Sequence, residues 1–172
     1  MLAADGTVTL DPITQEDGAL LGNLLELYIH DLSAIFTDVE LGADGRFGYP
    51  HLASYLAGSG DRFPYLIRCD GRVAGFILAR RGSPIAENPN VLDVAEYFVL
   101  RRFRGRGVGR AAAKLLWDNL RGAWTIRAAA VNPRAVAFWR SVVGTYTANV
   151  VTEAERSDGS KTWVVFSFDN GG

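Results

Sequence analysis

The chain has 172 residues, 48% of them hydrophobic, and a formal net charge of −1. This length suits one compact domain with a substantial core, and we predict a single domain over residues 1–172. A near-neutral charge argues against a long polyanion as the main partner, so we expect no nucleic-acid partner. The single cysteine, Cys69, cannot form an internal disulfide, which favours a reducing compartment. No run approaches the ~20 apolar residues of a membrane span and the start lacks the features of a signal peptide, so we expect a cytoplasmic protein with no membrane partner.

The first part of the chain predicts a strand and then an amphipathic helix. Residues 7–13 (TVTLDPI) predict the first strand, and Thr14 is a residue type that caps helices. The helix that follows has one core-facing stripe, made of Leu20, Leu21, Leu24, Leu25, Tyr28 and Leu32. Residues 38–62 are rich in Gly and Asp and predict an irregular segment, with a short helix near residues 51–57.

The middle of the chain predicts a hairpin and a central strand. Residues 63–79 contain two apolar runs around an Asp-Gly pair, which supplies the positive φ angles of a tight two-residue turn. Residues 91–100 (VLDVAEYFVL) form a further apolar run that is interrupted by Asp93 and Glu96. We predict that this strand lies in the middle of the sheet.

The remaining elements predict a mixed sheet. A helix is expected at residues 107–120, a strand at 123–131 and a second helix from Pro133 onward, followed by strands at 145–154 and 161–168. A strand, a helix and a second strand in this order imply a parallel crossover, whereas the Asp-Gly hairpins imply antiparallel neighbours.

Residues 100–116 (LRRFRGRGVGRAAAKLL) place a dense positive charge at the start of a predicted helix. The charges belong to Arg101, Arg102, Arg104, Arg106 and Arg110, and they surround glycines at positions 105, 107 and 109. The first turn of a helix has N–H groups without internal partners, and glycines let an anion approach them. No acidic residue occurs from Tyr97 to Trp117, and like charges repel one another unless an anion is present. The segment therefore predicts a phosphate site.

Other interpretations of this segment remain open but fit less well. The glycines alone would make a tight turn with solvated arginines around it. The pattern GVGRAA also satisfies a loose dinucleotide fingerprint, but that fingerprint follows the first strand and needs an acidic residue about 20 positions on. A nucleic-acid site needs aromatic side chains among the basic ones, and here only Phe103 is available.

Two motifs give the chain a family resemblance. Arg104-Gly105-Arg106-Gly107-Val108-Gly109, after a strand ending in YFVL, resembles the Q/R-x-x-G-x-G/A signature of the GNAT superfamily of acyl-CoA-dependent N-acetyltransferases. The segment NPRAVAFW at 132–139 is similar to a later helix motif of that family. The resemblance implies an α/β (α+β) fold with a mixed, mostly antiparallel sheet of about six or seven strands, helices on both faces and a splay between two central parallel strands.

The resemblance also implies acetyl-CoA as co-substrate, bound in the splay. Backbone amides from Arg104 to Arg110 would hold the pyrophosphate, and the main chain of Phe98, Val99 and Leu100 would pair with the pantetheine arm like an added strand. Asn132 would touch the arm, and Phe138 and Trp139 would line its end. The residues implied for coenzyme binding are Phe98, Val99, Leu100, Arg104, Gly105, Arg106, Gly107, Val108, Gly109, Arg110, Asn132, Phe138 and Trp139.

The implied reaction is attack of a primary amine, on a small molecule or a peptide, upon the thioester of acetyl-CoA. An alkylamine has a pKa of about 10, so a base must supply its neutral form, and Glu96 or Asp93 is the candidate because both lie on the strand beside the thioester. They are three positions apart, so strand alternation predicts that they face opposite sides. Trp139 stands where many members of the family have an acidic tyrosine, so Tyr146 is the candidate general acid, unless no acid is used.

The acceptor pocket is expected from the first helix and the irregular segment after it. Its candidate residues mix aromatic and polar groups: Tyr28, His30, Asp31, Phe36, Tyr49 and His51. We expect no metal, since no pair of these residues has ligand spacing beyond chance, and a monomer or a homodimer. The alternative function is a non-catalytic acyl-CoA-binding module of the same fold, suggested by Trp139 at the acid position.

Overall fold

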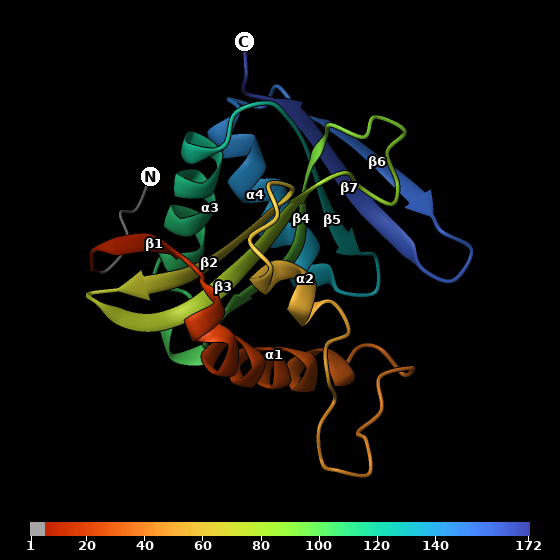
Figure 1. Ribbon diagram of the computed structural model, residues 1–172. Helices are drawn as coiled ribbons and strands as arrows, with labels where there is room; N and C mark the ends of the chain where they lie inside the picture. Colours follow the sequence, from red (N-terminus) through yellow and green to blue (C-terminus); the bar gives the residue numbers. More distant parts are fainter. Residues whose placement is uncertain (1–5) are drawn as a thin grey trace.

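The computed structural model describes residues 6–172 as one seven-stranded sheet with helices on both faces (Figure 1). The strands are β1 (Val8–Pro12), β2 (Arg62–Cys69), β3 (Arg72–Arg81), β4 (Leu92–Val99), β5 (Ala123–Ala129), β6 (Thr152–Ser157) and β7 (Thr162–Asp169). Their order in the sheet is β1-β2-β3-β4-β5-β7-β6, which puts β4 at the centre as predicted. All neighbours are antiparallel except β4 and β5, so the predicted mixed, mostly antiparallel sheet is confirmed.

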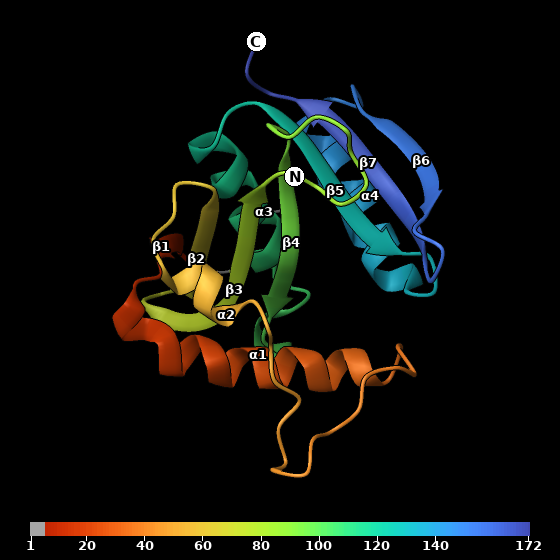
Figure 2. The ribbon, with the colours of Figure 1, turned by 45° about the vertical axis from the view of Figure 1, so that its right-hand side comes forward.

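The helices divide between the two faces of the sheet. They are α1 (Gly18–Ser33), α2 (Leu52–Leu56), α3 (Val108–Asn119) and α4 (Pro133–Tyr146). Helices α1 and α2 lie on one face, and α3 and α4 lie on the other (Figures 1 and 2). No helix within residues 6–172 has the length and apolar character that a bilayer crossing needs.

The two central parallel strands part soon after they meet. Strands β4 and β5 pair at only three positions, from Leu92 with Trp124 to Val94 with Ile126. Figure 2 shows the two strands side by side at one end of the sheet and well apart at the other. The predicted splay is therefore present, and it leaves the second half of β4 with a strand partner on the β3 side only.

A bulge in β4 overturns one prediction about its acidic residues. Leu78 of β3 pairs with Glu96, but the next residue, Ala79, pairs with Val94, so Ala95 is an extra residue in the ladder. An extra residue resets the alternation of side chains. Asp93 and Glu96 consequently project from the same face, the one covered by α1, and the expectation of opposite faces was wrong.

The end of α4 also differs from the prediction. We expected a strand over residues 145–154, but α4 continues to Tyr146 and β6 begins only at Thr152. The ring of Tyr146 packs on Trp117 of α3 with centroids 4.9 Å apart, so burial extends the helix. Ala148 and Asn149 then take positive φ angles of 50° and 66° and turn the chain toward β6.

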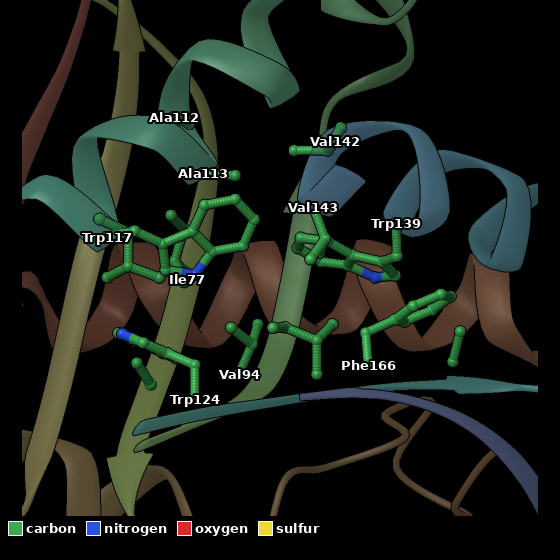
Figure 3. Close-up of a cluster of buried hydrophobic side chains, with 14 of the residues drawn as sticks. Ile77, Val94, Ala112, Ala113, Trp117, Trp124, Trp139, Val142, Val143 and Phe166 are labelled. Carbon is green, nitrogen blue, oxygen red and sulfur yellow. The ribbon is translucent and has the colours of Figure 1, made fainter. Parts of the chain in front are cut away.

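The main core fills the space between the sheet and the pair α3 and α4. Figure 3 shows small residues of α3 and the branched residues Val142 and Val143 of α4 facing side chains of the sheet. Trp117 of α3 and Trp139 of α4 lie in the same layer, and both are at most 5% exposed. This packing fixes the first turns of both helices beside the splay.

Candidate active site

A cavity of about 1310 Å³ lies at the splay. We call it the splay cavity, and it is lined by Tyr28, Asp31, Leu32, Ala34, Ile35, Tyr97, Phe98, Val99, Arg101, Arg104, Gly105, Arg106, Gly107, Gly109, Arg110, Val131, Asn132, Pro133, Arg134, Ala135, Phe138 and Trp139. These residues come from α1 on one face of the sheet and from α3 and α4 on the other. The cavity therefore passes through the sheet at the place where β4 and β5 have separated.

The N-terminus of α3 provides backbone donors in the cavity wall. Gly107 is the N-cap and has a φ of 77°, which a residue with a Cβ rarely adopts. The first backbone bond at this end is donated by Ala111 to the carbonyl of Gly107. The N–H groups of the preceding first turn have no intrahelical acceptor, and the helix dipole adds a partial positive charge there. An extra Cβ on Gly105 would meet no atom within 4 Å, so the approach to this turn is open.

Two of the five arginines are neutralised by a residue of α1. Asp31 accepts hydrogen bonds from Arg101 at 2.6 Å and from Arg104 at 2.7 Å. Burial raises the pKa of Asp31, but the hydrogen bonds from these arginines outweigh it and hold the pKa below its usual value. The arginine cluster therefore needs an external anion less than the sequence predicted, because Asp31, a carboxylate distant in sequence, supplies part of the counter-charge.

The other polar contacts orient the walls of the cavity. Arg104 also donates through Nε to the carbonyl of Val99 at 2.6 Å. Arg110 donates to the hydroxyls of Ser141 at 3.1 Å and Thr145 at 3.2 Å, which ties α3 to α4. Asn132 caps α4 by accepting from the amide of Ala135 at 3.1 Å.

Aromatic rings form the inner part of the cavity. Tyr97 packs edge-on against Trp139 with centroids 4.8 Å apart, and its ring is tilted by 39° to that of Phe138 with centroids 5.9 Å apart. The hydroxyl of Tyr97 donates to the carbonyl of Gly109, which links β4 to the first turn of α3. Sequence reasoning missed Tyr97, although its position next to Glu96 on an alternating strand places it on the face of α3.

Most residues predicted to bind the coenzyme line this cavity, but two do not. The amide of Leu100 donates to Ala74 and its carbonyl accepts from the amide of Phe103. Both backbone groups of Leu100 thus bond within the protein. The side chain of Val108 is completely buried in the core under α3.

Glu96 is held by two tyrosine hydroxyls on the face of α1. Tyr28 donates to its Oε2 at 2.7 Å, and Tyr49 donates to its Oε1 at 3.1 Å. Burial raises the pKa of the Glu96 carboxyl above its ordinary value, although both hydroxyls and the nearby guanidinium groups of Arg127 and Arg80 lower it. A carboxylate in this environment is a stronger base than one in water.

Asp93 has a different environment. Its side chain is completely buried and accepts hydrogen bonds from Arg80 at 3.1 Å, from Arg127 at 3.1 and 3.0 Å and from Ser83 at 3.2 Å. Arg80 belongs to β3 and Arg127 to β5. The carboxylate therefore ties together the three strands at the point where the sheet opens.

Tyr146 lies away from the cavity, at the last turn of α4. Its hydroxyl donates to Asp118 at 3.1 Å and accepts from Asn170 at 3.1 Å. Neither Tyr146 nor Glu96 is among the residues that line the splay cavity, and the two side chains lie on opposite faces of the sheet, so the structure does not bring them together.

The expected acceptor residues do not form a single cluster. Tyr28 and Tyr49 contact Glu96, and Asp31 pairs with the arginines as described above. The ring of His30 lies 6.4 Å from that of Phe47, and the ring of His51 lies 5.8 Å from that of Tyr49. Phe36 lies under the ammonium of Lys161 at 4.5 Å, so the segment after α1 reaches the β6–β7 hairpin. Within residues 6–172 no cluster of three or more acidic, His or Cys side chains is arranged to hold a metal ion.

Comparisons with known proteins agree with this geometry. The model of the acetyltransferase (GNAT) family matches residues 24–144. An acetyltransferase from Thermus thermophilus is similar in structure, with a TM-score of 0.67, 21% identity and coverage of 97% of this chain and 99% of that one. AAC(6')-Ib in complex with ribostamycin and coenzyme A has a TM-score of 0.66, 17% identity and coverage of 95% and 94%.

RimL, a ribosomal L7/L12 alpha-N-protein acetyltransferase in complex with coenzyme A, has a TM-score of 0.65, 15% identity and coverage of 99% and 98%. No curated protein sequence matches the chain significantly. The chain belongs to the GNAT acetyltransferase family. Membership implies an acyl-CoA-dependent acetyltransferase with acetyl-CoA as co-substrate.

The Asp93 network generates a prediction about stability. In Asp93→Asn the guanidinium groups of Arg80 and Arg127 lose their counter-charge, and both are largely buried. We expect the free energy of unfolding to fall by about 3 kcal/mol, measured by denaturant titration. Asp44→Asn, at an exposed turn, is the control and should change it by less than about 0.5 kcal/mol. Equal, small effects of the two variants would contradict the anchoring role of Asp93.

The glycine-rich segment just before α3 generates a prediction about coenzyme binding. Gly105 has a φ of 72°, a conformation that Asn and Asp tolerate better than other residues with a Cβ. Gly105→Asp places a negative charge beside the donors and should raise the Kd for coenzyme A by about tenfold or more, measured by calorimetry. Gly105→Asn has the same shape without the charge and should stay within about threefold of wild type, because only the charge repels phosphate. Identical Kd values for the two variants would show that no phosphate lies there.

Proposed function

We propose that the protein transfers the acetyl group of acetyl-CoA to a primary amine of a small molecule or peptide by direct attack. The observation that carries this proposal is the Glu96 carboxylate, which is held by Tyr28 and Tyr49 where β4 separates from β5. A partly buried carboxylate with a raised pKa suits the role of a base that takes a proton from an amine. AAC(6')-Ib is an aminoglycoside acetyltransferase and RimL is a ribosomal L7/L12 alpha-N-protein acetyltransferase, which makes amines of small molecules and of peptides reasonable acceptors.

The proposed coenzyme position follows the charge of the cavity walls. The amides from Arg104 to Arg110 would receive the pyrophosphate, since the helix N-terminus and arginine side chains favour an anion. The edge of β4 at Phe98 and Val99, which has no strand partner on the β5 side, would receive the pantetheine arm, with Asn132 beside it and Arg104 at the Val99 carbonyl. Phe138 and Trp139 would line the apolar end. The thioester would then lie near the face that carries Glu96.

Between the two acidic candidates we assign the base to Glu96. Asp93 already accepts four hydrogen bonds from charged or hydroxyl groups, so its lone pairs are engaged. Glu96 accepts only two, both from neutral hydroxyls. Asp93 would instead act on catalysis indirectly, by holding Arg127 of β5 and Arg80 of β3 beside Glu96.

The alternative is a module that binds acyl-CoA without turning it over. The observation in its favour is Trp139, which lies in the cavity wall at the position where the resemblance implies that many members of the family have an acidic tyrosine. Turnover of a panel of amines by the wild type and by Glu96→Gln, described next, separates the two functions.

Glu96→Gln should lower kcat about 10²–10³-fold, because the amide cannot accept a proton. The Kd for coenzyme A should stay unchanged. Thiol release is measured with acetyl-CoA and a panel of n-butylamine, spermidine, kanamycin and a peptide with a free N-terminus. The wild-type kcat/KM should rise with pH as Glu96 loses its proton, and the midpoint of this rise should lie above the usual carboxyl pKa. The rise should be absent in the variant.

Glu153→Gln, at an exposed ion pair with Arg140, is the control and should keep full activity. A variant Glu96→Gln with wild-type turnover would remove Glu96 from the mechanism. Coenzyme binding without turnover of any amine in the panel would favour the non-catalytic module.

A further inference from the structure

Tyr28 connects the two halves of the site. It lines the splay cavity, and its hydroxyl donates to Oε2 of Glu96 at 2.7 Å. Its ring is held edge-on to Phe76, with centroids 5.7 Å apart and planes at 89°, and lies 5.7 Å from Phe98. A phenol that is clamped between two rings and a carboxylate has little freedom to turn away. Tyr28 therefore presents a fixed hydroxyl at the wall between the cavity and the proposed base.

The other hydroxyl and indole groups near the cavity are less suited to giving up a proton. The indole of Trp139 is not an acid at neutral pH. Tyr146 is engaged with Asp118 at the far end of α4. The hydroxyl of Tyr97 donates to the carbonyl of Gly109, an acceptor that has no proton to return.

We propose that Tyr28 protonates the departing thiolate of coenzyme A, and that Glu96 returns the proton to Tyr28. This role rests on the proposed function, in which Glu96 is the base. It assigns the acid to α1 rather than to α4. A residue of the first helix thereby joins the chemistry that the resemblance placed on the last helix.

The proton balance of the step closes within this pair. The amine enters in its neutral form, its ammonium proton having passed to solvent. Its nitrogen bonds to the thioester carbon, the carbonyl π electrons move to oxygen, and Glu96 takes one proton from the nitrogen through an intervening water, because Glu96 is not among the residues that line the splay cavity. When the tetrahedral intermediate collapses, the carbonyl re-forms, the C–S bond breaks and sulfur takes the hydroxyl proton of Tyr28. The Tyr28 oxygen takes the proton from the Glu96 carboxylic acid. One proton has moved from the amine to the thiol, and both side chains have regained their initial state.

The surroundings of Tyr28 favour a transfer without a free phenolate. Burial, Glu96 and Tyr49 raise the pKa of Tyr28 well above its ordinary value, although Arg127 lowers it. An isolated phenolate is therefore costly here. Loss of the proton to sulfur and gain of a proton from Glu96 are expected to occur together.

Tyr49 provides a matched control. It donates to the other oxygen of Glu96 at 3.1 Å, but it is not among the described residues that line the splay cavity. Tyr28→Phe and Tyr49→Phe each remove one hydroxyl from the same carboxylate and keep the ring. Both hydroxyls lower the pKa of Glu96, so both variants should move the acidic limb of kcat/KM to higher pH.

The experiment compares these variants with Glu96→Gln, using acetyl-CoA and the amine from the panel above that gives the highest turnover. Tyr28→Phe should lower kcat about 10²-fold with little change in the KM for acetyl-CoA, because the thiolate then leaves unprotonated. Tyr49→Phe also disturbs Glu96 but should lower kcat at least tenfold less than Tyr28→Phe, because Tyr49 takes no part in proton transfer to sulfur. Equal kcat values for the two phenylalanine variants would overturn the role of Tyr28 and leave Glu96 as the base.

Equal kcat values for the two phenylalanine variants would overturn this inference alone, whereas other results reach further. No turnover of any amine by the wild type would overturn both. Wild-type turnover in Glu96→Gln would overturn the relay and the assignment of Glu96 as the base, and would leave acetyl transfer to an amine standing. A second measurement on the wild-type protein covers the case in which Tyr28→Phe does not fold. In mixtures of H₂O and D₂O, the plot of kcat against the deuterium fraction should bow below the straight line that joins the values in the two pure solvents, as expected when two protons move together. A straight line would overturn the relay.

Discussion

Hydrogen bonding between β4 and β5 ends at Val94 and Ile126, and the rest of the site depends on that early ending. A sheet that stayed paired would have no opening between its two central strands. Because the strands part, the edge of β4 from Tyr97 to Val99 borders a cavity in place of another strand. The same opening connects the face of α3 and α4, which carries positive charge, to the face of α1, which carries Glu96.

Buried charge stabilises the sheet at the point of parting. Asp93 bonds to guanidinium groups from the strands on either side, so the three central strands stay together just before they separate. Asp31 makes a similar link farther along, from α1 to Arg101 and Arg104. Both carboxylates therefore compensate positive charge within the protein itself. Asp31 thereby ties the arginine segment before α3 to α1.

Local patterns in the sequence were sufficient for the element order and for most of the cavity wall. The glycines before α3 and the Pro133 start of α4 carry their signals within a few residues, and these elements lie where they were expected. The bulge at Ala95 was not predictable, because it depends on how β3 pairs with β4. The same holds for the contacts of Tyr28 and Asp31, whose partners lie about 70 positions away. Long-range pairing, rather than composition, decided which faces the acidic residues share.

The most direct test of this account is a crystal structure of the protein with coenzyme A. The account predicts the pyrophosphate against the amides at the start of α3, the pantetheine arm along the edge of β4 and the sulfur within hydrogen-bond reach of the Tyr28 hydroxyl. Coenzyme bound outside the splay, or a closed sheet with β4 and β5 paired beyond Val94, would contradict it.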